Sequence, residues 1–254
     1  MGLTDYSITQ PTIYLERRAQ AMGLSLDEFR VPPINVICLG LEGQALIAFL
    51  KATPLQGLPV HYVGHLDDVP VGVTPMTGFG APYFAVLVEQ LIACGAQSIL
   101  FSGAMGAFQP ELHIGDFIIP THAIIGEGTS RYYSAYVSLP RPHAEIVTLF
   151  ETACKNLKVN PHLGTVWSTD AVYREMRSQV ETLQQRGVLG VDMETSALFT
   201  MAHHHQIKAG CIHRVSDSLA TLTWQPHFHS PQYLHASQEV TPKILVECIH
   251  LLSR

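Results

Sequence analysis

The stretch from residue 188 to residue 218, VLGVDMETSALFTMAHHHQIKAGCIHRVSDS, contains the pattern that decides the fold. It begins with a short apolar strand, VLGVD, continues as a helix over ETSALFTMAHHH, and ends in a second strand, KAGCIHRVSDS. Strands that are apolar on both faces are typical of sheets covered by helices on both sides. The stretch therefore predicts a strand–helix–strand unit of an α/β protein.

The same alternation extends along the chain from the strand INVICLG at 34–40 to a final helix at 239–252. Apolar strands that alternate with helices indicate a mostly parallel sheet covered on both faces. Residues 12–30 are predicted to be helical, because the prolines at 32 and 33 stop a helix and start an extended run. We find no repeat or linker, so we expect one domain over 1–254, with 1–33 as a helical N-terminal extension.

The composition is poor in charge. Only 14% of the residues are charged, against about 25% in an average soluble domain, so we expect part of the surface to be covered in a homo-oligomer. The net charge of −6 argues against a nucleic-acid partner. No window holds 18 consecutive apolar residues, so we expect no membrane-spanning helix.

The N-terminus and the cysteines point to the cytoplasm. The chain does not start with a basic segment followed by an apolar run, so we expect no signal peptide. No two of the five cysteines form a CxxC pair. We therefore expect buried, reduced thiols in a cytoplasmic protein.

Three expected strand ends carry glycine, at 40–43, 78–80 and 103–106. Ligands of open α/β sheets bind at the carboxyl ends of strands, and backbone N–H groups in such turns can hold an oxyanion. Each of these segments, taken alone, is also consistent with an ordinary turn that connects a strand to a helix. Because G-x-G-x-x-G and G-x-x-x-x-G-K-[ST] are both absent, we predict neither a dinucleotide site nor a P-loop.

Two acidic residues each follow a run of apolar residues. Asp217 comes after the strand in HRVSDSL, and Glu194 stands where the strand VLGVD meets a helix. Burial raises the pKa of a carboxyl group and suits it for general-acid work. The simpler alternative is structural, with Asp217 capping the next turn and Glu194 capping its helix.

Five segments in one order resemble the nucleoside phosphorylase family, which includes hexameric purine nucleoside phosphorylases, uridine phosphorylases and methylthioadenosine/adenosylhomocysteine nucleosidases. They are TGFGAPYFAVLVEQL (77–91), FSGAMGAFQPELHIGDFIIPTHAIIGEGTSRYY (101–133), STDAVY (168–173), VDMETSALFTMA (191–202) and RVSDSL (214–219). The resemblance implies a three-layer α/β/α fold around a mixed central sheet that closes partly into a barrel. It also implies a pentosyltransferase that cleaves the bond between ribose and base, with a nucleoside as substrate.

The resemblance assigns roles by position. Glu194 binds the ribose hydroxyls, Met193 packs under the sugar, and Asp217 protonates a departing purine at N7. Val172 and Tyr173 lie beside the base, although Val172 stands where many members have phenylalanine. Ser216 and Gly106 complete the expected substrate-binding group.

The acceptor that attacks the ribose is left open by the sequence. Phosphorylases hold phosphate with arginines, and Phe101 stands where one is usual; the chain also lacks arginine over 44–52. Phosphorolysis would then rely on Gly40, Gly103, Ala104 and Arg131, with inorganic phosphate as co-substrate and no other cofactor.

The nucleosidase branch offers the main alternative, since it carries a glutamate in the first loop to activate water. Glu42 is placed for that role. The simpler interpretation is that Glu42 is a solvated carboxylate at the start of a helix. A nucleoside-binding protein without turnover is the third possibility.

The histidines are not predicted to bind a metal. His203, His204 and His205 are consecutive, so on a helix they point in different directions. His227, His229 and His235 fall in WQPHFHSPQYLH, a segment that the family pattern does not explain. We expect this segment to be a loop that covers the pocket or packs at a subunit interface, in a dimer or a hexamer.

Overall fold

The computed structural model describes residues 7–58, 60–134 and 138–253. Its strands are β1 (Ile34–Leu39), β2 (Thr53–Pro54), β3 (Tyr62–Leu66), β4 (Val69–Met76), β5 (Ser98–Ala107), β6 (Phe117–Gly126), β7 (His162–Thr169), β8 (Gly190–Asp192), β9 (Lys208–Ser218) and β10 (Gln225–Pro226). Its α-helices are α1 (Pro11–Met22), α2 (Gly40–Phe49), α3 (Ala81–Ala93), α4 (Ala144–Asn156), α5 (Arg177–Gln185), α6 (Thr195–His205), α7 (Pro231–His235) and α8 (Thr241–Leu252). Short helical turns are η1 (Leu26–Phe29), η2 (Ser130–Tyr132), η3 (Val172–Arg174) and the π-helical η4 (Ala236–Val240).

These strands form one sheet in the order β10-β9-β6-β7-β8-β5-β1-β4-β3-β2. An additional pairing of β9 with β5 returns the sheet to itself, so that β9, β6, β7, β8 and β5 close into a barrel. The strands β1, β4, β5 and β9 run parallel where they pair, whereas β8 runs antiparallel to β5 and β6 antiparallel to β9. The partly barrel-closed, mixed sheet that the resemblance implied is thus confirmed.

The expectation of a mostly parallel sheet, drawn from the alternation of strands and helices, holds for the long ladders that join β1, β4, β5 and β9 and that join β6 to β7, but the sheet also contains antiparallel pairs that the alternation did not predict. The strands β3 and β4 form an antiparallel hairpin, and closure of the barrel adds the antiparallel pairs of β8 and β6. The turn of that hairpin has Asp67 in the left-handed region, with φ of 52°. Apolar patterning reports burial on both faces, which is the same for either strand direction, so it could not reveal this arrangement.

The two ends of the chain also differ from the sequence prediction. The predicted helix over 12–30 is interrupted at Gly23, which ends α1 with φ of 68° and leads into η1. Glycine adopts this conformation at little cost and commonly ends helices. The final helical region begins earlier than predicted, at α7, so His235 lies on a helix and not in a loop.

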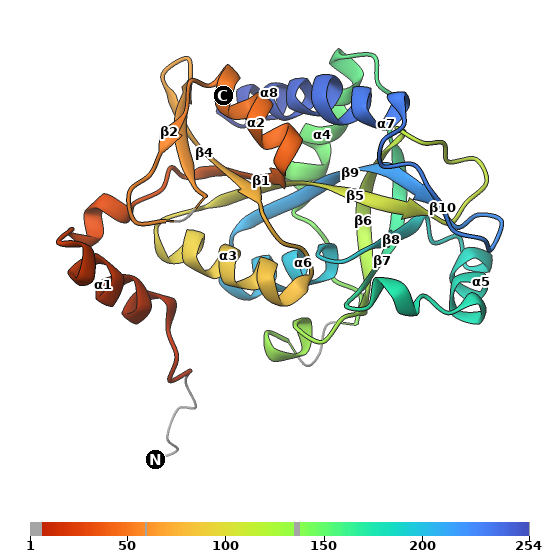
Figure 1. The fold of residues 1–254 in the computed structure, drawn as a ribbon, viewed down its shortest axis with the longest axis horizontal. Helices are drawn as coiled ribbons and strands as arrows, with labels where there is room; N and C mark the ends of the chain where they lie inside the picture. The colour runs from red at the N-terminus through yellow and green to blue at the C-terminus, as the bar shows by residue number, and fades with distance from the viewer. Residues whose placement is uncertain (1–6, 59, 135–137, 254) are drawn as a thin grey trace.

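Helices cover both faces of the sheet (Figure 1). On one face, α2, α4 and α8 bury a core that includes Leu46, Phe150 and Ile244. On the other face, α1, α3 and α6 bury a second core that includes Phe84 and Phe199. None of the helices in the described part of the chain is long and apolar enough to cross a membrane.

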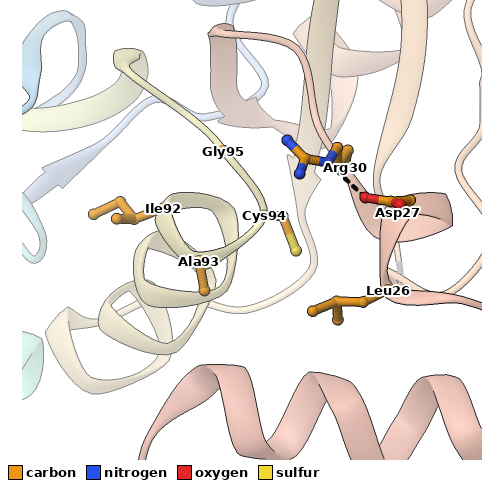
Figure 2. A pocket seen from close by; sticks show the side chains of 7 residues that line it. All are labelled: Leu26, Asp27, Arg30, Ile92, Ala93, Cys94 and Gly95. Atoms are coloured by element: carbon orange, nitrogen blue, oxygen red, sulfur yellow. Dashed lines mark hydrogen bonds and ion pairs between the residues drawn. The ribbon is translucent and has the colours of Figure 1, made fainter.

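The N-terminal extension docks on the end of α3, where a small cavity of about 170 Å³ lies (Figure 2). Val31 N–H donates to the Cys94 carbonyl at 3.0 Å and ties the two segments together. Asp27 and Arg30, which lie on the rim, form an exposed ion pair at 2.9 Å. Burial raises the pKa of the Cys94 thiol to about 11, so this cysteine is an unreactive packing residue. All five cysteines are buried and free, as predicted.

Candidate active site

Three strands bring Asp217 together with three of the predicted substrate-binding residues, Gly106, Met193 and Glu194. Gly106, near the end of β5, is aligned with Val191 of β8 on one side and with Asp217 of β9 on the other. Met193 and Glu194 follow β8 directly, so they and Asp217 flank the end of β5. A Cβ atom at Gly106 would lie 2.9 Å from Asp217 Oδ2, so this close approach requires glycine.

Glu194 begins α6, but its side chain does not cap the helix. Its Oε1 accepts a 2.5 Å hydrogen bond from the backbone N–H of Gly80, the turn that follows β4. Burial, reinforced by the charge of Asp192, raises the pKa of Glu194 to about 8. Met193 lies at the same turn, with its Cε 3.9 Å from the position of a Cβ on Gly80. The ribose-binding pair and the second glycine turn therefore form one wall.

Asp192 takes the capping role instead. Its Oδ2 accepts from the backbone N–H groups of Glu194 at 3.1 Å and Thr195 at 2.7 Å. Its Oδ1 accepts from the Ser168 hydroxyl at 2.5 Å, and the buried His213 lies 3.7 Å from Oδ2. The helix start that presents Glu194 is thus fixed by a buried polar network from β7, β8 and β9.

Asp217 is buried and accepts two hydrogen bonds. The Ser216 hydroxyl donates to its Oδ1 at 2.6 Å, and the Trp224 indole N–H donates to its Oδ2 at 2.8 Å. The register between β5 and β9 shifts by one residue at Ser216, and such bulges redirect side chains near active sites. The side chain therefore bonds to a segment that folds back over it, not to the next turn.

Glu175 is a second carboxyl group near Asp217, and the sequence analysis missed it. Burial, followed by the negative charge of Asp217, raises the pKa of Glu175 to about 7. The only sequence signal was an acidic residue two positions after Tyr173. The predicted base-contacting residues, Val172 and Tyr173, are 38% and 87% exposed on η3, so they do not form a closed base pocket.

Glu42 is fully buried in the first turn of α2, which contradicts the reading as a solvated carboxylate. It forms an ion pair with Arg214 of β9, and its Oε1 accepts from the Ser237 hydroxyl at 3.1 Å. Burial raises the pKa of Glu42 to about 7, against the opposing effect of the Arg214 charge. The residue is therefore a buried acid–base group that an arginine holds.

Arg214 is the cation that the sequence analysis did not single out. Its guanidinium donates to the Gly103 carbonyl at 3.0 Å and the Ser102 hydroxyl at 3.2 Å, and it lies 5.3 Å from the Tyr233 ring centre. A charge inside an apolar strand is rarely buried without a partner. The arginine in KAGCIHRVSDS therefore indicated a buried charge with a partner, although the sequence did not show that this partner is Glu42.

The predicted phosphate group is only partly assembled. Gly103 lies against Arg214, and Ala104 is aligned with Arg214 across the sheet. Gly40 is the first residue of α2, two positions before Glu42. Arg131 has other contacts, since it stacks on Tyr132 at 5.0 Å. The cation at the Gly103 turn is therefore Arg214 and not Arg131.

Arg131 lines a separate cavity of about 1380 Å³ between the start of α1, the face of α3, η2 and the end of α6. Two of the three consecutive histidines also lie there: His205 bonds Glu89 at 2.9 Å, and His204 Nδ1 lies 3.1 Å from the Tyr133 carbonyl. Among the described residues, no group of three or more His, Cys, Asp or Glu side chains is arranged to hold a metal. His227 and His229 are exposed.

The fold and these strand ends define the class of protein. Residues 48–249 match the model of the Phosphorylase superfamily, and the chain belongs to this family. It is 32% identical over 199 residues to a protein named Uridine phosphorylase from Thermococcus kodakarensis, covering 73% of this chain and 71% of the relative.

Other relatives carry different names. A Guanosine phosphorylase from Halorubrum lacusprofundi is 31% identical over 56% of this chain and 59% of its own length. A Purine nucleoside phosphorylase DeoD-type from Roseobacter denitrificans is 31% identical over 57% and 63%. The chain thus spans less than two thirds of these two relatives. Nucleoside phosphorylases are pentosyltransferases, and the enzyme class that the motifs predicted is confirmed.

Proposed function

We propose that this protein cleaves the N-ribosyl bond of purine nucleosides by phosphorolysis, releasing the free base and ribose 1-phosphate. The observation that carries the proposal is the pair of buried carboxyl groups, Glu194 and Asp217, that flank the end of β5. Relatives named for guanosine and purine nucleosides support a purine. Relatives named for uridine make uridine the competing substrate.

The chemistry follows from the charge that develops during cleavage. As the bond from C1′ to the base nitrogen breaks, its electron pair moves to the base and the ribose becomes oxocarbenium-like. Asp217 delivers a proton to N7 of the departing purine, and one positioned acid typically contributes about 10²–10⁴-fold. Glu175, whose pKa is raised to about 7 by burial and by the charge of Asp217, can restore the proton of Asp217. Glu194 holds the ribose hydroxyls, and a phosphate oxygen forms the new bond to C1′.

Arg214 is the residue that would attract phosphate, because it lies against the Gly103 turn. Its charge is balanced by Glu42 as long as Glu42 is ionised. Protonation of Glu42, whose pKa lies near 7, would leave Arg214 free to bind an anion. Phosphate binding is therefore expected to be weak at high pH and stronger in mildly acidic solution.

Hydrolysis is the second candidate function, and the buried pair of Glu42 and Arg214 favours it. Glu42 Oε2 and Arg214 Nε are buried and have no hydrogen-bond partner among the described residues. Two such atoms in one cluster are suited to hold a water molecule. A carboxylate whose pKa lies near 7 is matched to act as general base on that water at neutral pH.

One experiment separates these functions. Inosine, adenosine, uridine and methylthioadenosine are each incubated with the protein, with and without phosphate, and the free base is measured. Phosphate-dependent release from the purine nucleosides supports the proposal; release without phosphate supports hydrolysis, and cleavage of uridine alone contradicts the purine assignment. If no base appears, the protein is a nucleoside-binding protein without turnover.

The variant Glu42→Gln refines this test, with Glu239→Gln as the matched control. Glu239 is 63% exposed at its side chain and pairs only with His235 among the described contacts. Hydrolysis should collapse in Glu42→Gln, because the general base is lost. Phosphorolysis should survive, because a carboxylate that repels phosphate has been removed.

A further inference from the structure

Trp224 stands out because half of its side chain is exposed although its indole N–H is bonded to a buried carboxylate. The N–H donates to Asp217 Oδ2 at 2.8 Å, and the residue is 50% exposed. Large aromatic side chains that are held by a polar handle and leave a ring face open are typical of binding surfaces. Asp217 is the residue that protonates the departing base in the proposed function.

The backbone holds this segment in place over the end of β9. β10 pairs antiparallel with Asp217 and Ser218, and His227 N–H donates to the Ser216 carbonyl at 3.1 Å. Before Trp224 in the chain, the Ala220 carbonyl accepts a 2.8 Å hydrogen bond from the Gln184 side chain. The position of the indole is therefore set by the fold and not by the indole bond alone.

A base that takes a proton from Asp217 must lie within hydrogen-bond reach of its carboxyl oxygens. The indole already lies within that reach of Oδ2, so the base and the indole share the same small space. On the η3 side, Val172 offers no ring, and Tyr173 is 87% exposed. Trp224, half exposed and bonded through its indole N–H, is thus an aromatic side chain that the structure holds against Asp217.

We propose that Trp224 is a substrate-binding residue, on which the purine ring of the nucleoside stacks while the indole N–H positions Asp217. The proposal rests on the proposed function, because it takes Asp217 as the group that meets the base. It extends that function by placing the start of the segment WQPHFHSPQYLH (224–235), which the family pattern does not explain, in the base site.

Two substitutions separate the ring from its N–H group. In Trp224→Phe the ring remains, so the KM for inosine should stay within about threefold. The kcat for inosine should fall, because Asp217 loses the donor that positions its carboxyl group. In Trp224→Leu the stacking surface is lost, and KM should rise on the order of tenfold, within the range that base–aromatic stacking provides. Phe49→Leu, an exposed aromatic residue on α2, is the matched control and should change neither quantity.

Fluorescence gives a direct reading of stacking. The chain has two tryptophans, and Trp167 is buried, so the difference between wild type and Trp224→Phe isolates Trp224. Hypoxanthine should quench that signal, whereas ribose 1-phosphate, which has no ring, should not. If wild type cleaves inosine but hypoxanthine leaves Trp224 unquenched, or if Trp224→Leu keeps the KM, stacking is refuted and the function stands.

The remaining outcomes separate a failure of the stacking proposal from a failure of the proposed catalytic function. If no nucleoside is cleaved but hypoxanthine still quenches Trp224, the stacking holds and the proposed catalytic function fails. If neither cleavage nor quenching is seen, both are wrong. Circular dichroism of each variant, compared with wild type, separates a loss of fold from a loss of the site.

Discussion

Removing Arg214 should expose the cost of burying Glu42 alone. The two side chains are 1% and 0% exposed, so in Arg214→Met the carboxylate keeps its burial and loses its counter-charge. Breaking a buried pair on one side typically costs about 3–5 kcal/mol. Total stabilities lie at about 5–15 kcal/mol, so the effect is large. For a chain of this size, about 1 kcal/mol corresponds to about 2–4 °C in Tm.

The pH dependence distinguishes this cause from a general packing defect. The folded pKa of Glu42, about 7, lies above its unfolded value, so the carboxyl group favours the folded state at low pH and this contribution is lost as pH rises toward 7. Without the Arg214 charge, which lowers that pKa, Glu42 should remain protonated to still higher pH. Arg214→Met should therefore be much less destabilised at pH 5 than at pH 8.

Urea unfolding at pH 5 and pH 8 measures this directly, with Glu42→Gln and the double variant for comparison. In Glu42→Gln no carboxyl group titrates at this site, so the variant lacks the fall in stability that the wild type shows with rising pH, and its loss relative to wild type should be larger at pH 5 than at pH 8. The double variant should lose less than the sum of the two single variants, because no unpaired charge remains. A loss below about 1 kcal/mol in Arg214→Met at pH 8, or simple additivity, would refute the reasoning.

Four further outcomes are expected. Above pH 8, where Glu194 is ionised, Glu194→Gln should lower kcat/KM for the nucleoside at least about tenfold, because charged hydrogen bonds contribute about 1.5–3 kcal/mol each; unchanged steady-state kinetics would contradict this. Asp217→Asn should slow inosine more than a riboside with an activated leaving group, and equal losses would count against a general acid. The KM for phosphate should rise from pH 6 to pH 8 as Glu42 ionises, whereas a flat profile would argue against this coupling. Gly106→Ala should impair turnover more than folding, since its Cβ would lie 2.9 Å from Asp217 Oδ2; normal rates with an intact circular dichroism spectrum would show that the contact is unimportant.

Much of the local structure could be predicted from the sequence, because it depends on neighbours in the chain. The apolar run at 34–39 and the helix that follows it at Gly40 appear as predicted. Gly95 follows the end of α3 with φ of 111°, which matches its predicted place after the helix. The antiparallel pairs of β5 with β8 and of β6 with β9 were not predicted, because they join strands that are distant in the chain.

By itself, the sequence determined the family, the buried strands and the two acids at strand ends, Glu194 and Asp217. Only the tertiary structure decided what these acids meet, because the partners are remote in the chain. Glu194 bonds Gly80, 114 positions away, and Glu42 meets Ser237 across 195 positions. A residue pattern records its own burial and local propensity, but it does not record which distant side chain fills the same space. For that reason Glu42, expected to be solvated or to face a water molecule, is held by a buried arginine, and Trp224 covers Asp217.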